Sequence, residues 1–194
     1  MFTKLFLSFR KIKYGKNLKL KGTPFIYNKK GSKISIGDNC TIKSSFLSNL
    51  VGLYQRSIIV TRVPGASITI GDNVGLSGVT IYARKSITIG DNVCIGGNVK
   101  ILDNDFHPTD IDKRNKLLSG KAPESGDEQE WIGSKPIIIE NNCFIGCNAL
   151  ILKGTVLKEG CVVGAGAVVA GGTFEKGSVI VGNPARVIKT IDIK

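Results

Sequence analysis

Apolar residues recur at every sixth position over much of the chain. Starting from Ile139 in steps of six, eight of nine positions are aliphatic: Ile139, Ile145, Ile151, Leu157, Val163, Val169, Glu175, Val181 and Val187. The position four residues after each of the first eight is small: Cys143, Ala149, Thr155, Cys161, Ala167, Thr173, Val179 and Ala185. This period fits neither an α-helix nor an alternating strand. It predicts very short strands joined by tight turns and stacked as a solenoid, each rung burying one large and one small residue.

The same phase appears earlier in the chain, where three of its turns read Gly-Asp-Asn. These turns lie within the segments 36–40, 70–74 and 89–93. Glycine and asparagine tolerate a positive φ, and Asx side chains bond to the nearby backbone. Cys40, Cys143 and Cys161 fall on the small inward position, so we expect them to pack as small apolar residues. Cys94 and Cys147 fall elsewhere on the hexad.

Two segments interrupt the period. Residues 43–67 carry it poorly, although 57–63 is typical of a strand ended by Pro64 and Gly65. Residues 103–136 lose it altogether and hold eight of the fifteen acidic residues with only five basic ones. A long excursion without regular structure inside a compact repeat is uncommon and usually functional. The only histidine of the chain, His107, lies near its start.

Composition and charge exclude several classes of protein. The 194 residues favour a single domain, and no apolar run approaches the ~20 residues that cross a bilayer. The sequence offers no secretory signal, and its five cysteines cannot all pair, so we expect a cytoplasmic protein with reduced thiols. One histidine excludes sites that need several imidazoles from one chain. There is also no P-loop, no GxSxG elbow and no CxxC pair.

The amino-terminal segment is strongly basic. Residues 1–33 hold ten Lys and Arg and no acid, within a chain of 27 basic and 15 acidic residues and a net charge of +12. Phe2, Leu5, Phe6 and Phe9 have helical spacing. A helix here either lies on an anionic membrane surface through residues 1–13, peripheral at the inner membrane face, or caps the open end of the first coil. No basic motif interleaved with aromatic residues points to a nucleic-acid partner.

The hexads resemble those of the hexapeptide-repeat acetyltransferases, and two further motifs resemble that family as well. These are Asp103-Asn104-Asp105-Phe106-His107-Pro108, which opens a loop, and the closing Val181-Gly182-Asn183-Pro184-Ala185-Arg186-Val187-Ile188. Among that family the chain is most similar to the sugar O-acetyltransferases, such as galactoside and maltose acetyltransferase and the capsule and O-antigen enzymes. The resemblance covers about residues 31–190.

This resemblance implies an all-β fold, a left-handed parallel β-helix with about 18 residues in each coil. It also implies a homotrimer whose active sites lie between neighbouring subunits, with acetyl-CoA along the groove. We therefore expect a basic cap at residues 1–30 and the β-helix domain at residues 31–194, with the excursion loop at 103–136. The spacing from Ile70 to Ile89 is 19, so a small bulge is expected near residues 82–86.

Acetyl transfer to an alcohol needs a base near the hydroxyl and donors for the oxyanion. His107 matches the catalytic histidine of the family. Asp105 lies two residues earlier, so in an extended segment both side chains point to one face. It either orients the imidazole, binds a sugar hydroxyl or is a solvated loop carboxylate. Asp103 is a further candidate for the acceptor.

The resemblance also implies a set of residues for coenzyme A. Phe144 stands where the family often carries a tryptophan beside the thiol. Backbone N–H groups near Gly146 and Cys147 would face the thioester carbonyl, and the turn at Ala165 would allow close approach. Arg186 and Lys189 match basic positions that meet the phosphates. One departure is Ala170-Gly171, where relatives often have Thr-Lys.

Two residues remain as candidates for the acceptor. Ser77 lies near a position where galactoside enzymes carry an asparagine, which argues against strict galactoside chemistry. Trp131 is interpreted as a loop anchor or a stacking platform for the substrate.

The predicted function is an acetyl-CoA-dependent O-acetyltransferase that acts on a hydroxyl of a sugar or polysaccharide precursor without a metal. The hydroxyl attacks the thioester directly, because no serine or cysteine stands in a nucleophile–base arrangement. The alternatives are N-acetylation of an amino sugar, acetylation of an antibiotic, and a non-enzymatic β-helix scaffold.

Overall fold

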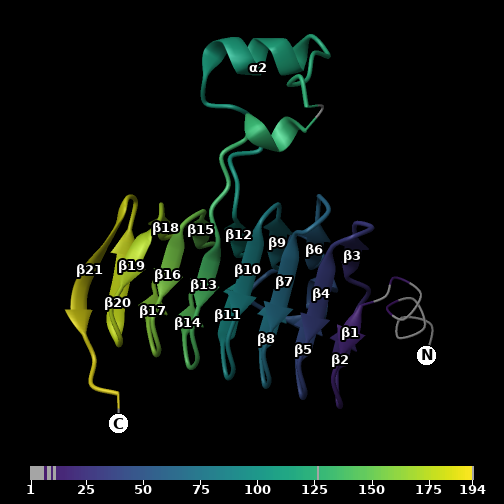
Figure 1. The fold of residues 1–194 in the computed structure, drawn as a ribbon. Coiled ribbons are helices and arrows are strands. Elements are labelled where there is room, and N and C mark those ends of the chain that lie inside the picture. The colour runs from purple at the N-terminus through teal and green to yellow at the C-terminus, as the bar shows by residue number, and fades with distance from the viewer. Residues whose placement is uncertain (1–6, 8–9, 11, 126, 194) are drawn as a thin grey trace.

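The chain winds into three parallel sheets that form the three faces of a long prism (Figure 1). The computed structural model describes residues 7, 10, 12–125 and 127–193. Each strand pairs with the strand three places along the chain, so successive strands visit the three sheets in turn. The left-handed β-helix predicted from the sequence is confirmed.

The strands are short, as a six-residue period requires. Sheet A consists of β1 (Lys13–Tyr14), β4 (Lys33–Ile36), β7 (Ser67–Ile70), β10 (Ser86–Ile89), β13 (Ile137–Ile139), β16 (Thr155–Leu157) and β19 (Gly172–Phe174). Sheet B consists of β2 (Lys19–Lys21), β5 (Thr41–Lys43), β8 (Gly75–Ser77), β11 (Cys94–Gly97), β14 (Phe144–Ile145), β17 (Val162–Val163), β20 (Ser178–Gly182) and β21 (Ala185–Thr190). Sheet C consists of β3 (Phe25–Asn28), β6 (Ile58–Thr61), β9 (Thr80–Ala83), β12 (Lys100–Leu102), β15 (Leu150–Leu152) and β18 (Val168–Val169). The final strand β21 runs antiparallel to β20.

The core follows the sequence period through most of the chain. The six aliphatic positions from Ile139 to Val169 are all fully buried, and the small positions between them are buried as well. The period fails in the last coil. There Ile180 is buried, whereas the predicted Val181 is half-buried and Val187 is exposed on the antiparallel strand.

The corner between sheets A and B explains the Gly-Asp-Asn turns. Each Asx side chain accepts a hydrogen bond from the backbone of the preceding rung: Asp72 from Asp38 N at 2.7 Å, Asp91 from Asp72 N at 2.7 Å and Asn141 from Asp91 N at 2.8 Å. In the three Gly-Asp-Asn turns the asparagine, Asn39, Asn73 or Asn92, has a φ of +57°. The turn chemistry is therefore also the contact between coils.

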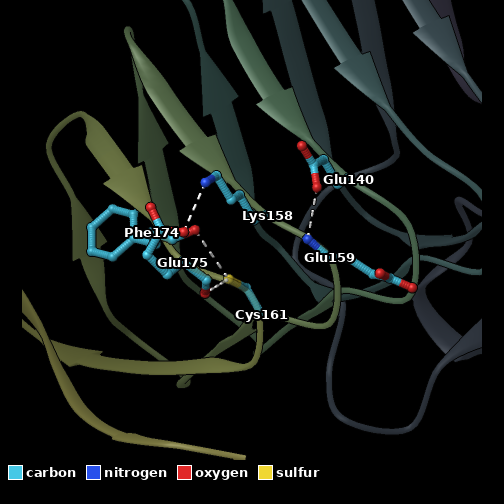
Figure 2. A network of polar contacts seen from close by, with 6 residues as sticks. All are labelled: Glu140, Lys158, Glu159, Cys161, Phe174 and Glu175. Carbon is cyan, nitrogen blue, oxygen red and sulfur yellow. Dashed lines mark hydrogen bonds and ion pairs between the residues drawn. The ribbon is translucent and has the colours of Figure 1, made fainter. Parts of the chain in front are cut away.

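Charged residues continue this corner toward the carboxyl terminus, as Figure 2 shows. The backbone N–H of Glu159 donates to Glu140 Oε2 at 2.9 Å, and Lys158 Nζ lies 2.7 Å from Glu175 Oε2. Cys161 Sγ donates to the Glu175 carbonyl at 3.2 Å. Glutamates and a lysine thus replace the Asp–Asn ladder of the earlier coils.

The three inward cysteines pack as the sequence predicts. Cys40, Cys143 and Cys161 are each at most 1% exposed, and each thiol donates to a carbonyl of the next rung. Burial raises the pKa of the Cys40 thiol. All five cysteines are free thiols in the structure.

The β-helix begins before residue 31. Strands β1, β2 and β3 pair with β4, β5 and β6 and form the first coil, so residues 13–28 of the expected cap lie within the solenoid. Lysines on the outside hide the period there, while Ile12, Leu18 and Ile26 fill the interior.

Part of the amino-terminal prediction lies outside the described residues. Phe2, Leu5, Phe6 and Phe9, on which the amphipathic helix depends, are among the positions that the structure does not describe. Leu7 is described and is buried in the core. Within the described part of the chain, no helix has the length and apolar character needed to cross a membrane.

Two insertions interrupt the coils where the sequence period breaks. Between β5 and β6 the chain makes a loop with one 3-10 turn, Phe46–Ser48. Between β12 and β13 a long excursion projects from one corner of the prism (Figure 1) and contains α2 (Ile111–Leu118) and the 3-10 turn Glu128–Glu130. The sequence did not predict α2. Its signals are present, since the Asp110 side chain caps Lys113 N and Gly120 has a φ of +78°.

The bulge expected near residues 82–86 is a two-residue bend instead. Arg84 and Lys85 join β9 to β10, and Ile87 and Ile89 pair in register with Ile68 and Ile70. The shift in register lies in β11, between Ile95 and Gly97. The extra residue lies in the bend between sheets C and A, where no strand pairing is interrupted by it.

Candidate functional site

The excursion leaves and rejoins the prism at the corner between sheets C and A. Its outgoing and returning arms are joined by an isolated bridge between Asn104 and Ser134, and Asp105 N donates to the Gly133 carbonyl at 3.0 Å. His107 lies two residues beyond this pairing and its side chain is exposed. The pairing of the two arms therefore fixes the start of the turn that carries His107.

The histidine turn is strained. His107 N donates to the Asp105 carbonyl at 2.7 Å, and the central residue Phe106 has a φ of +63°. Among the described residues it is the only one with a positive φ that is neither glycine nor asparagine. Such a conformation costs about 1–3 kcal/mol and persists only where the surroundings enforce it. Phe106 N donates to Asn104 Oδ1 at 2.9 Å, and the Phe106 ring packs on Tyr82 with centroids 4.9 Å apart.

The burial and hydrogen bonds of Asp103 conflict with its predicted contact to an acceptor. It is fully buried, and its carboxylate accepts hydrogen bonds from Arg84 N at 2.8 Å and Lys85 N at 2.7 Å. Burial raises the pKa of this carboxyl, while the hydrogen bonds oppose the rise. Asp103 therefore caps the bend between β9 and β10 and offers no free oxygen to a sugar.

Asp105 pairs with a lysine that the sequence did not single out. Lys153 Nζ lies 2.5 Å from Asp105 Oδ2, although the two residues are 48 positions apart. The expectation that Asp105 and His107 share a face assumed an extended segment. This assumption is wrong, because Phe106 has a φ of +63°. Asp105 thus faces the β15–β16 bend.

A cleft lies beside this pair. It has a volume of about 280 Å³ and is lined by Asn104, Asp105, Lys135, Leu152, Lys153, Gly154, Ala170, Gly171 and Gly172. A second hollow of about 330 Å³ shares Ala170 and Gly171 with it and reaches Phe174, Pro184 and Arg186. Together they make a groove along the last coils. Arg186 lines this groove. Lys189 is not among the lining residues and sits opposite Val179 in the β20–β21 ladder.

The other residues expected at coenzyme A lie on a different corner of the prism. Phe144, Gly146, Cys147 and Ala165 belong to the junctions of sheets B and C, and Phe144 is 47% exposed. A Cβ on Gly146 would lie 2.5 Å from Ala165 N, so close stacking of the turns requires glycine there. Within one chain the fold does not bring this corner together with His107.

The two predicted acceptor residues also lie apart. Ser77 ends β8 at the junction of sheets B and C and is only 7% exposed. Trp131 is half-buried and ends the 3-10 turn of the excursion, where its N–H donates to the Glu128 carbonyl at 3.1 Å.

Arg84 is a second residue that the sequence reasoning missed. Its side chain is 9% exposed, and its Nε and Nη1 have no hydrogen-bond partner among the described residues. Its Nη2 lies 4.0 Å from Glu128 Oε2, which is too far for a hydrogen bond. No motif marks this arginine, since its burial depends on the bend beneath the excursion.

Comparison with known proteins agrees with the fold. Residues 136–170 match the family model of the hexapeptide repeat of succinyl-transferase. None of the curated proteins matches the sequence.

Several solved structures have the same architecture. The N-acyltransferase AntD from Bacillus cereus, in complex with dTDP-4-amino-4,6-dideoxyglucose and coenzyme A, has a TM-score of 0.64 at 19% identity, over 98% of this chain and 90% of that chain. A hexapeptide-repeat-containing acetyltransferase from Vibrio cholerae has a TM-score of 0.60 at 20% identity, over 98% and 81% of the two chains. A maltose O-acetyltransferase from Clostridium difficile has a TM-score of 0.50 at 22% identity, over 93% and 70%. The chain therefore has the six-residue repeat and the β-helix fold of the hexapeptide-repeat acyltransferases, as its sequence motifs predict.

Proposed function

We propose that this protein is an acetyl-CoA-dependent acyltransferase that acetylates a hydroxyl group of a sugar or glycan precursor. The observation that carries the proposal is the only histidine of the chain, which is exposed on an enforced turn beside a groove of a hexapeptide-repeat β-helix. The strained residue, Phe106, directly precedes the one histidine of the chain, whose imidazole can act as a general base. Strain of this kind gathers at active sites.

The proposed chemistry is direct transfer. His107 accepts the proton of the acceptor hydroxyl as the oxygen attacks the thioester carbon. The tetrahedral intermediate then collapses, the C–S bond breaks, and the imidazolium returns the proton to the sulfur of coenzyme A. Gly146 N already donates to the Val163 carbonyl at 2.7 Å, so the oxyanion role falls to Cys147 N.

The groove supports a route for coenzyme A. Its floor at Ala170, Gly171 and Gly172 has almost no side chain, which lets a long ligand approach the backbone closely. Arg186 supplies a guanidinium at the far end, suited to a phosphate. The site is proposed to need no metal.

Because His107 and the Phe144–Ala165 corner are apart in one chain, we place the complete site between subunits of a homotrimer. Exposed apolar side chains at the same B–C corner support such contacts: Phe46, Leu47, Leu50, Val51 and Tyr54. Burying them against a neighbour would remove apolar surface from water. We further propose a cytoplasmic location, with residues 1–13 either at a membrane surface or capping the first coil.

N-acetylation of an amino sugar is the second candidate activity, because AntD, which has a similar fold, is an N-acyltransferase crystallised with an amino sugar nucleotide. Amine acceptors therefore belong in the same assay as hydroxyl acceptors.

The test measures release of the coenzyme A thiol from acetyl-CoA with matched hydroxyl and amino sugars. We expect transfer to a hydroxyl, and a fall of about 10²–10⁴-fold in kcat for His107→Ala. Arg114→Met is the control, since Arg114 only donates to the Pro108 and Thr109 carbonyls within the excursion.

Full activity of His107→Ala would refute the assigned base. Transfer to amines alone would favour N-acetylation, and no binding of acetyl-CoA would favour a scaffold.

A further inference from the structure

The ion pair between Lys153 and Asp105 joins the catalytic turn to the body of the β-helix. Asp105 belongs to the outgoing arm of the excursion and Lys153 to the bend between β15 and β16. Their charged atoms are 2.5 Å apart, and the side chains are 23% and 31% exposed, respectively. A lysine in this place restrains the residue whose carbonyl closes the His107 turn.

The neighbouring backbone is shaped around this pair. A Cβ on Gly133 would lie 2.6 Å from Asp105 Oδ2 and 2.7 Å from Lys153 Nζ, so a side chain at residue 133 would force the pair to move from its present position. Gly133 also accepts the hydrogen bond of Asp105 N. The β15–β16 bend is fixed to the returning arm as well, since Gly154 N donates to the Pro136 carbonyl at 3.1 Å. Both partners are therefore held on rigid supports, unlike a typical surface ion pair.

The restraint on Asp105 matters because the turn at Phe106 is strained. Phe106 stays left-handed only while its surroundings hold it, and one end of the three-residue turn is Asp105. Without the Lys153 partner, the backbone bond to Gly133 is the one described contact that ties Asp105 to the returning arm, and the turn gains freedom to relax toward an ordinary conformation. The imidazole two residues on would then lose its fixed direction.

We propose that Lys153 is a positioning residue for the reaction, which acts through Asp105 to hold the His107 turn in its productive conformation. This inference rests on the proposed function and adds to it a residue that never touches the reacting atoms. The competing role is direct contact with coenzyme A, because Lys153 also lines the cleft.

Steady-state kinetics separate these two roles. Loss of positioning lowers kcat, since a displacement near 1 Å costs up to about 10²-fold, and it leaves the KM for acetyl-CoA within about twofold. We expect this result for Lys153→Met and for Asp105→Asn, with no further loss in the double variant. Lys153→Arg should retain most of the activity, because it keeps the ion pair.

Lys158→Met is the matched control. It also breaks a lysine–carboxylate ion pair, with Lys158 Nζ 2.7 Å from Glu175 Oε2, but at the corner between sheets A and B, and Lys158 lines neither hollow of the groove. Its kcat should equal that of the unaltered protein. A rise in the KM for acetyl-CoA at constant kcat in Lys153→Met would overturn the proposal, as would additive losses in the double variant.

A second measurement does not depend on acetyl transfer. The chain has one histidine, so the untagged protein gives a single imidazole Hε1–Cε1 NMR signal. We expect this signal to shift or broaden in Lys153→Met and to stay unchanged in Lys158→Met. An unmoved signal in Lys153→Met refutes the positioning role, whereas a moved signal without acetyl transfer by the unaltered protein refutes only the proposed function.

Discussion

At the residue scale, the most unusual group in the molecule is the guanidinium of Arg84. A cation taken out of water costs several kcal/mol unless a partner and hydrogen bonds compensate it. Here two of its nitrogens are buried with no hydrogen-bond partner in the part of the chain that the structure describes, and the nearest carboxylate, on Glu128, lies 4.0 Å from Nη2 and is itself 55% exposed. The arginine therefore contributes little to stability, or opposes it.

Replacing Arg84 by methionine should stabilise the protein. Methionine keeps the apolar length of the side chain and removes the uncompensated charge, so we expect the free energy of unfolding to rise by about 1–2 kcal/mol. Chemical denaturation measures this change. Arg62→Met, which removes one charge from an exposed side chain, should stay within about 0.5 kcal/mol. A clear loss of stability in Arg84→Met would mean that the guanidinium is paired in solution.

At the scale of the elements, the turns carry the contacts between coils. Each Gly-Asp-Asn corner places an Asx oxygen against the backbone of the preceding rung, and the glycine lies where that oxygen passes. Only a residue without a Cβ leaves the oxygen in place. Successive coils are thus held together by a row of hydrogen bonds at one corner as well as by the aliphatic core.

Two glycines four positions apart test this ladder. A Cβ on Gly71 would collide with Asp91 Oδ1 and lie 2.7 Å from the Gly90 carbonyl carbon, whereas one on Gly75 would meet nothing within 4 Å. We expect Gly71→Ala to lower the free energy of unfolding by about 1–3 kcal/mol. Gly75→Ala should leave it unchanged or raise it by about 0.5 kcal/mol. Equal effects of the two substitutions in guanidinium titrations would refute the role of the ladder.

At the scale of the whole molecule, the prism separates the residues of the proposed site. His107 projects from the junction of sheets C and A, and the turns near Phe144 and Ala165 lie at the junction of sheets B and C. A rigid β-helix cannot bend to join two of its own corners. A second subunit is then the simplest way to complete the site.

Mixed subunits test this arrangement. His107→Ala removes the base, and Ala165→Trp blocks the other corner at an exposed position. Each variant alone should be inactive. Co-expressed in equal amounts, they should recover activity at roughly a quarter of the sites, those where an intact His107 faces an intact neighbour. Sedimentation checks the trimer, and no recovery in a mixed trimer would place the site within one chain.

The sequence by itself determined the coils. The six-residue period, the small inward positions and the Asx turns are local and repeat from rung to rung, so they predict a solenoid of short strands, its core and the place of the excursion. The resemblance of the motifs to a known family added the left-handed β-helix. The same local reasoning contained the signals for α2 but did not recognise them, and it placed the first coil too late, because exposed lysines masked its period.

Only the tertiary structure decided the surroundings of His107. Asp103 and Asp105 look alike in the sequence, yet one is buried beneath a bend and the other is paired with a lysine 48 residues away. Phe106 is left-handed because Tyr82, Asn104 and the returning arm hold it, and no local preference of phenylalanine indicates this. Contacts between distant segments set these positions, whereas a repeating pattern records only what each residue does within its own coil.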